Sequence, residues 1–171
     1  MTSHMHVSPS ADPWKSIFAL TALLLGCSGV EQGRNQLAEP DYGQFPKVAD
    51  AIAPSCATLD CHGQIGRNFR FYWSRGLRLA SDGRPGEGET TPDEYLMTYR
   101  SLVGLEPYKL DSVVKGKVKA DSLTIVRKAR GVEAHKGTAG QLAIGSDADR
   151  CLVTWLANAT DSDACNRAAG K

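Results

Sequence analysis

Two cysteines and a histidine within seven residues constrain this chain more than any other feature. In one-letter code, residues 56–62 read CATLDCH, so four residues separate the cysteines and the histidine directly follows the second one. Two thiols at such a spacing can hold one covalently attached group close to the backbone. The adjoining imidazole can then ligate a metal within that group. The fold must therefore accommodate whatever this stretch holds.

The pattern C-x-x-x-x-C-H is a longer form of C-x-x-C-H, the attachment motif for haem c. The thiols of Cys56 and Cys61 would each add across one haem vinyl group, and His62 would reach the iron as the proximal ligand. The two extra residues bulge out as a loop. Gly63 lets the chain turn away from the porphyrin face, because it has no side chain. The sequence predicts one covalent haem c, since it contains no second attachment motif.

Two other interpretations of these residues stay open. Cys56 and Cys61 are close enough in sequence to form a small disulfide loop in an oxidising compartment, and His62 would then be incidental. A zinc site is the third interpretation. It needs a fourth ligand and usually a second close pair, and the sequence contains neither a second C-x-x-C nor an H-x-x-x-H.

Residues 1–26 are typical of a lipoprotein signal peptide. Residues 17–25 form a short apolar run after Lys15, too short for a permanent membrane span but suited to a signal-peptide core. The run ends in Leu-Leu-Gly-Cys27, which resembles a bacterial lipobox, where cleavage precedes a cysteine that carries diacylglycerol. We expect lipidation at Cys27 and a lipid-anchored protein of the bacterial cell envelope, facing the periplasm or the outer surface. The alternative is a plain secretory signal with a chance cysteine.

The five cysteines are an odd number, which is awkward if every thiol of a secreted protein forms a disulfide. Acylation of Cys27, haem attachment at Cys56 and Cys61, and a disulfide between Cys151 and Cys165 would leave no free thiol. That disulfide would close a loop of about 15 residues, pin the carboxyl-terminal tail and contribute about 3 kcal/mol. The alternative is two unpaired cysteines, with Cys151 buried in a helix.

Composition indicates one domain after the leader. Residues 27–43 are polar and contain glycine and proline, so we expect a flexible tether followed by a single domain over residues 44–171. The formal net charge is +1 and no long run of one sign exists, which argues against nucleic-acid binding. We expect a mainly α fold.

Four segments carry the expected secondary structure. An apolar stripe predicts a helix over residues 45–53, ended by Pro54, and alternation of apolar residues between 64 and 90 predicts a short β-hairpin. Thr91, as N-cap with Pro92 and Glu94, is typical of a helix start with a capping box. The buried stripe of this helix is expected to consist of Tyr95, Leu96, Tyr99, Leu102 and Val103. Further helices are expected over about 121–129 and, capped by Ser146, over about 146–158.

The distal iron ligand is expected to be His135, which lies in a glycine-rich segment before the last predicted helix. Met97 is an alternative, although it falls opposite the apolar stripe of its own predicted helix. A five-coordinate iron is the third possibility, and it would open peroxide or gas chemistry.

Together these features resemble the planctomycete-type single-haem cytochrome c domains, over roughly Phe45 to Ala159. The resemblance implies a cytochrome c-like helical domain around one haem, with electron transfer as its role. Two departures are the spacing of the cysteines and Lys136, where such modules tend to have glycine. The matching residues are Cys61-His62-Gly63, Gly76-Leu77-Arg78-Leu79, Asp121-Ser122-Leu123, His135, Gly137, Gly140 and Trp155-Leu156.

The function expected from the sequence is one-electron transfer outside the cytoplasm by a carrier that is not an enzyme, with haem peroxidase activity left open. A disulfide-bonded, non-haem lipoprotein that serves as an envelope binding or structural module is the alternative. No G-x-S-x-G motif supports a hydrolase. A local basic cluster suggests an acidic redox partner protein. Its members are Lys115, Lys117, Lys119, Arg127, Lys128 and Arg130.

Overall fold

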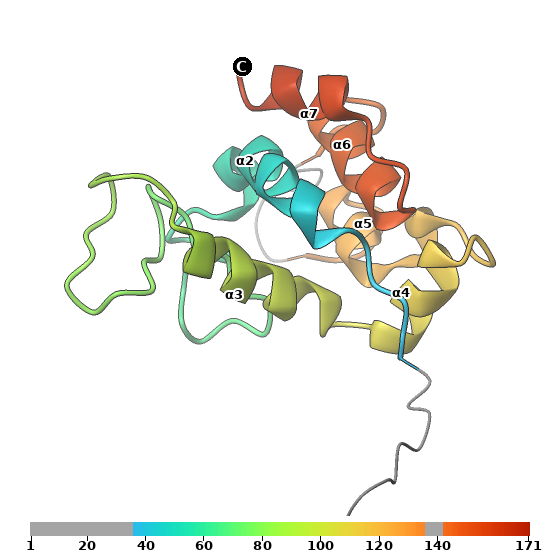
Figure 1. Cartoon of the computed structure of the whole chain (residues 1–171), viewed down its shortest axis with the longest axis horizontal. Helices are drawn as coiled ribbons and strands as arrows, with labels where there is room; N and C mark the ends of the chain where they lie inside the picture. The colour runs from blue at the N-terminus through green and yellow to red at the C-terminus, as the bar shows by residue number, and fades with distance from the viewer. Residues whose placement is uncertain (1–35, 136–141) are drawn as a thin grey trace, which may run out of the picture. The chain divides into compact units, whose positions relative to one another are not determined.

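Six α-helices and two short 3-10 helices make up the regular structure of residues 36–135 and 142–171, which are the residues that the computed structural model describes (Figure 1). The mainly helical class expected from the sequence is confirmed. The leader, Cys27 and residues 136–141 lie outside the described residues. Within the described part, no helix is long and apolar enough to cross a membrane. The helices are η2 (Tyr42–Gln44), α2 (Phe45–Cys56), α3 (Pro92–Val103), α4 (Pro107–Val114), η3 (Ala120–Ser122), α5 (Thr124–Ala129), α6 (Asp147–Leu156) and α7 (Ser162–Ala168).

Helix α2 is the central element and packs against α6 and α7 (Figure 1). Its apolar stripe is buried as the sequence predicts, with Phe45 and Ile52 at most 1% exposed. Phe45 packs against the Trp155 ring of α6, with ring centroids 5.1 Å apart. Such aromatic pairs contribute about 0.5–1.5 kcal/mol beyond their buried area.

The expected end of this helix at residue 53 is wrong, because α2 includes Pro54 and continues to Cys56. A proline removes only one backbone donor, and in the last turn few hydrogen bonds depend on it. The Ala57 N–H still donates to the Ala53 carbonyl at 2.8 Å. Cys56 is therefore held as the last residue of a buried helix rather than in a loop.

Helix α3 begins as the sequence predicts. Thr91 is its N-cap, and the reciprocal hydrogen bonds of a capping box join Thr91 and Glu94. The expected stripe is confirmed at its last three members, Tyr99, Leu102 and Val103, whereas Tyr95 and Leu96 are only half-buried. The polar residues Glu94 and Thr98, which were not expected there, are at most 1% exposed. Polar residues can occupy that face only because the preceding segment of chain satisfies their hydrogen bonds.

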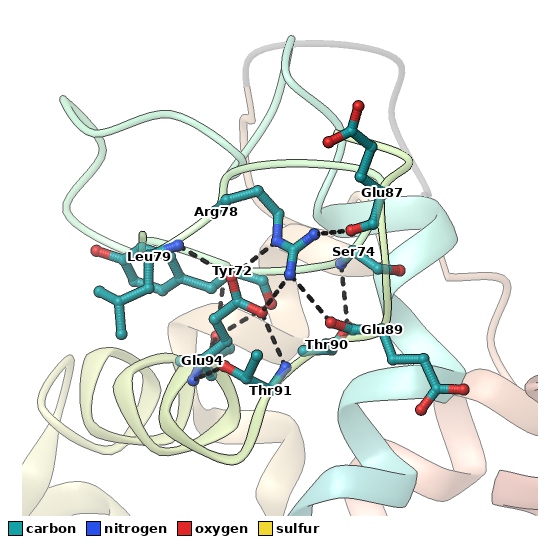
Figure 2. A network of polar contacts seen from close by, with 10 residues as sticks. Tyr72, Ser74, Arg78, Leu79, Glu87, Glu89, Thr90, Thr91 and Glu94 are labelled. Carbon is teal, nitrogen blue, oxygen red and sulfur yellow. Dashed lines mark hydrogen bonds and ion pairs between the residues drawn. The ribbon is translucent and has the colours of Figure 1, made fainter. Parts of the chain in front are cut away.

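The segment between residues 64 and 90 covers that face of α3 without forming the expected β-hairpin. Among the described residues its β pairing is limited to one isolated bridge, between Tyr72 and Leu77. Side chains of α3 accept backbone hydrogen bonds of this segment instead (Figure 2). Tyr72 N–H donates to Thr98 Oγ1 at 2.9 Å and Leu79 N–H to Glu94 Oε1 at 2.9 Å. These acceptors replace a partner strand.

An ion pair between Arg78 and Glu94 is the centre of this contact (Figure 2). Arg78 Nε donates to Glu94 Oε1 at 2.8 Å, and its Nη2 donates to the Glu89 carbonyl at 3.0 Å. The side chain of Arg78 is 10% exposed and that of Glu94 is 2% exposed. Burial alone would raise the pKa of Glu94, but the hydrogen bonds from Arg78, Thr91 and Leu79 outweigh it and hold that pKa below its usual range.

Two α-helices, α4 and α7, and the 3-10 helix η2 were not expected from the sequence. The segment expected as one helix over 121–129 divides at Leu123 into η3 and α5. Helix α6 begins after Ser146, whose hydroxyl accepts from the Asp149 N–H, so the expected cap is confirmed. The chain turns just after this helix, at Asn158, which has a φ of 56°. The short lengths of α4 and α7 explain why periodicity missed them.

Cys151 of α6 and Cys165 of α7 form a disulfide, the pair expected from the sequence. Both residues are fully buried. The bond ties α7 to α6, and α7 in turn packs on α2.

The compact unit begins at Leu37 rather than at residue 44. The Ala38 N–H donates to Asp111 Oδ1 at 2.7 Å, and the Pro40 carbonyl accepts from the Tyr99 hydroxyl at 2.9 Å. Trp155 Nε1 donates to the Asp41 carbonyl at 2.8 Å. The last part of the expected flexible tether is therefore fixed to the domain.

Replacing both Cys151 and Cys165 by alanine should lower the free energy of unfolding by about 3 kcal/mol, because the unfolded chain regains the freedom of the loop. Urea unfolding of oxidised protein followed by circular dichroism measures this change. Reduction of the wild type should give a similar loss, and a double variant as stable as the wild type would contradict the role of the bond.

Glu94→Gln should destabilise the fold by about 3–5 kcal/mol at pH 7, because Arg78 is left buried without its charge partner. The lowered pKa of Glu94 means that its contribution is present above about pH 4.5 and is lost as the pH falls through the folded value. The stability difference between wild type and variant should therefore shrink at pH 3. Urea titrations at both pH values test this, with Asp147→Asn, in an exposed ion pair, as the control with the smaller loss.

Candidate functional site

A cavity of about 630 Å³ opens beside the end of α2. This volume is within the range of small-molecule and cofactor sites. Its walls come from α2, the chain between residues 61 and 69, α5 and α6, and they are mostly apolar. The principal lining residues are Ile52, Cys56, Cys61, His62, Arg67, Phe69, Leu105, Glu106, Ile125, Lys128, His135, Leu142 and Leu152.

The sequence-predicted attachment residues all line this cavity. Cys56 and Cys61 are free cysteines, and both are half-buried. The residues between them form a compact loop, in which the Cys61 N–H donates to the Thr58 carbonyl at 2.9 Å and the His62 N–H to the Cys56 carbonyl at 3.0 Å. The helix end and the loop together present two thiols and one imidazole to the same space.

Gly63 has a different role from the one expected. A Cβ atom at this position would collide with the backbone carbonyl oxygens of Ala57 and Thr58, and one at Gly76 would collide with the same Ala57 oxygen. Close approach of three backbone segments therefore requires both glycines. Both glycines therefore allow the loop of residues 57–60 to pack closely against the chain that follows it.

His62 is held by a hydrogen bond between its Nδ1 and the Phe69 carbonyl oxygen, at 2.9 Å. A carbonyl oxygen can only accept, so Nδ1 carries the proton and Nε2 is left as the free lone pair of a neutral imidazole. The Phe71 N–H donates to the His62 carbonyl at 2.9 Å and fixes the backbone as well. Burial lowers the pKa of His62, the Phe69 carbonyl raises it, and the nearby His135 and Arg67 lower it further. A neutral imidazole with its second nitrogen bonded to a carbonyl is the state that ligates metals.

The His135 ring lies 5.7 Å from the His62 ring, measured between centroids, with an angle of 28° between their planes. His135 lines the same cavity from the segment that follows α5. Its Nδ1 atom is buried and has no hydrogen-bond partner among the described residues. Met97, the alternative distal ligand, does not line the cavity.

This arrangement fits a haem with two axial imidazoles. A bond between a metal and an imidazole nitrogen is about 2 Å long, so two imidazoles on opposite sides of one metal have centroids roughly 6 Å apart. The observed 5.7 Å is close to this separation. The two free thiols stand beside the proximal histidine, as covalent attachment requires.

The other expected site features are less supported. Within the described residues, no group of three or more His, Cys, Asp and Glu side chains lies close enough to hold a metal ion without a cofactor, so the zinc interpretation lacks a ligand set there. The basic cluster is largely neutralised by acidic partners, because Lys115 pairs with Asp111 and both Arg127 and Lys128 pair with Glu133.

Sequence reasoning missed two contributors to the site. The Phe69 carbonyl is a backbone group, which leaves no signal in the sequence, and the Phe69 side chain also lines the cavity. Glu106 lines the cavity and accepts from the Thr124 N–H at 2.6 Å, tying the start of α4 to α5. Neither residue belongs to a recognisable motif.

Comparisons with protein families, with curated proteins and with solved structures found no match to this chain.

In the haem-free chain, Cys56 should react slowly with iodoacetamide. Burial, with a smaller contribution from Cys61, raises the pKa of the Cys56 thiol to about 12. Since only the thiolate reacts, the folded chain at pH 8 should alkylate Cys56 roughly a thousandfold more slowly than a thiol with the ordinary pKa. Mass spectrometry of tryptic peptides measures the rate, with the urea-unfolded chain as control. Equal rates in the folded and unfolded chains would contradict burial of this thiol.

Proposed function

We propose that this protein is an extracytoplasmic electron carrier with one covalently attached haem c, folded as a cytochrome c-like helical domain. The observation that carries the proposal is the pair of imidazoles, His62 and His135, whose ring centroids lie 5.7 Å apart in a cavity that two free thiols also line. A disulfide between Cys151 and Cys165 is compatible with a location outside the cytoplasm.

Each residue of the site has a defined task in this proposal. The Sγ atoms of Cys56 and Cys61 would form the two thioether bonds, and His62 and His135 would supply the two axial nitrogens. When bound, the haem supplies reversible one-electron chemistry. The hydrogen bond from His62 to the Phe69 carbonyl orients the proximal ring and increases its basicity. Apolar walls such as Ile52 and Leu152 exclude water and so influence the potential.

Two histidine ligands favour electron transfer over catalysis, because they leave no open position on the iron for peroxide or oxygen. The role as a carrier that is not an enzyme follows from His135, and peroxidase activity would require its displacement. Lys117 and Lys119 remain exposed in the basic cluster, and we propose that an acidic redox partner protein docks near them. Lipid attachment at Cys27 would confine this exchange to a membrane surface.

The alternative, a non-haem lipoprotein of the envelope, requires a bridge between Cys56 and Cys61. Those residues are free thiols in the structure, so the alternative lacks one of its two disulfides.

Expression in a host that matures c-type cytochromes should give a red protein with one haem per chain, and its haem stain should survive denaturing electrophoresis. The reduced spectrum should show the sharp bands of a six-coordinate haem. The double variant Cys56→Ala and Cys61→Ala should lose the stain, because both thioethers are gone.

His135→Ala should keep the stain and lose the six-coordinate spectrum, whereas Met97→Ala should leave the spectrum unchanged. The second variant is the matched control, because Met97 lies outside the cavity lining. A colourless wild type from a host that matures a control cytochrome would overturn the proposal and favour the non-haem lipoprotein.

A further inference from the structure

Arg130, which lies between α5 and His135, forms an ion pair with Asp149 of α6. The guanidinium of Arg130, just after α5, makes two parallel contacts with Asp149 of α6. Nε lies 2.6 Å from Oδ1, and Nη2 lies 3.0 Å from Oδ2. Their side chains are 11% and 3% exposed. A bidentate arginine–carboxylate pair is geometrically specific as well as strong, and a pair so little exposed is only weakly screened.

The pair joins the two ends of the chain that carries His135. Arg130 immediately precedes this chain, and the same Asp149 Oδ2 accepts from the N–H of Gly145, just before α6, at 2.8 Å. A second contact links the chain before α6 to the end of α5, because the Leu142 N–H donates to the Ala129 carbonyl at 3.0 Å. Leu142 is 2% exposed and lines the cavity. These contacts fix the distance between the end of α5 and the start of α6, the two helices that flank the segment containing His135.

Other contacts also hold this segment, among them a backbone hydrogen bond from the Val132 N–H to the Arg127 carbonyl at 2.9 Å. Lys128 Nζ donates to the Ala134 carbonyl at 2.8 Å, and Glu133 pairs with Arg127 and Lys128 through side chains that are 34–47% exposed. Exposed ion pairs contribute little. The His135 Nδ1 has no partner among the described residues, so its ring lacks the hydrogen bond that orients His62. The position of His135 therefore depends on its backbone.

We propose that Arg130 is the positioning residue for His135: through Asp149 it fixes the chain ends that hold this imidazole opposite His62. The inference rests on the proposed haem site. It makes Arg130 a structural part of that site rather than a member of a docking surface, in contrast to its neighbours in the basic cluster. Its exposed contact with Asp121, at 2.8 Å, is a secondary anchor.

The test uses haem-loaded protein with the variants Arg130→Gln, Arg130→Lys and Asp149→Asn. All three should keep the haem stain, because Cys56 and Cys61 are untouched. Carbon monoxide competes with the distal ligand, so the reduced variants should bind it roughly 10- to 100-fold more tightly than the wild type. Arg130→Lys should show the effect too, since lysine keeps the charge but not the paired contacts.

Arg167→Gln is the matched control. Arg167 makes the same type of two-point contact with Asp147 at the start of α6, but this pair is exposed and does not adjoin the His135 segment. Its carbon monoxide affinity should equal that of the wild type. In a His135→Ala background, Arg130→Gln should have no further effect, because a positioning residue acts only through the ligand that it positions. Unchanged affinity in all three variants, or an equal effect without His135, would overturn the inference.

A second measurement separates this inference from the proposed function and does not need the haem. In the haem-free chain, Arg130→Gln should accelerate hydrogen exchange at the Leu142 amide and leave the Phe71 amide, which donates to His62, unchanged. Accelerated exchange in a chain that never binds haem would support the role of the Arg130–Asp149 pair, even though the proposed function would then fail. Unchanged exchange at the Leu142 amide would refute the positioning role of Arg130, whatever the chain binds.

Discussion

The packing of α2 against α6 and α7 is the interaction on which the rest of this structure depends. Phe45 meets Trp155 at one end of α2, and Ile52 reaches the cavity at the other. Because both faces of contact are apolar and buried, α2 has one position, and that position fixes Cys56 at its last turn. The disulfide between α6 and α7 restrains the partners of α2 as well. The thiol of Cys56 is thus placed by the core, and the loop that follows it places Cys61.

The two histidines are positioned by different means. His62 belongs to a loop in which backbone hydrogen bonds, two glycines without room for a Cβ and the Phe69 carbonyl all act within a few residues. His135 depends on a longer connection, whose ends are joined by Arg130 and Asp149. Local contacts restrain His62, whereas contacts at the two ends of a longer segment restrain His135. This asymmetry matters for any ligand held between them.

The segment between residues 64 and 90 shows where periodicity fails as a guide. Its alternating apolar residues suggest a strand, but a strand needs a partner and here α3 supplies one through side chains. Glu94 is the clearest example. Its capping role is legible from Thr91 and the spacing, whereas its second role as the buried partner of Arg78 is not, because these residues are 16 positions apart. A carboxylate on the buried face contradicts a hydrophobic pattern unless the tertiary partner is known.

Local chemistry determined what could be read from the sequence alone. The C-x-x-x-x-C-H motif, the capping box at Thr91, the Ser146 cap and the apolar stripe of α2 depend on residues a few positions apart, and each is present in the structure. Tertiary structure decided that His135 rather than Met97 lies near His62, and that Arg130 is paired with Asp149 rather than free for docking. It also decided that residues 38–41 join the domain. These outcomes depend on contacts between segments distant in sequence, whose energies come from the burial of the whole core. No short pattern of residues can encode them.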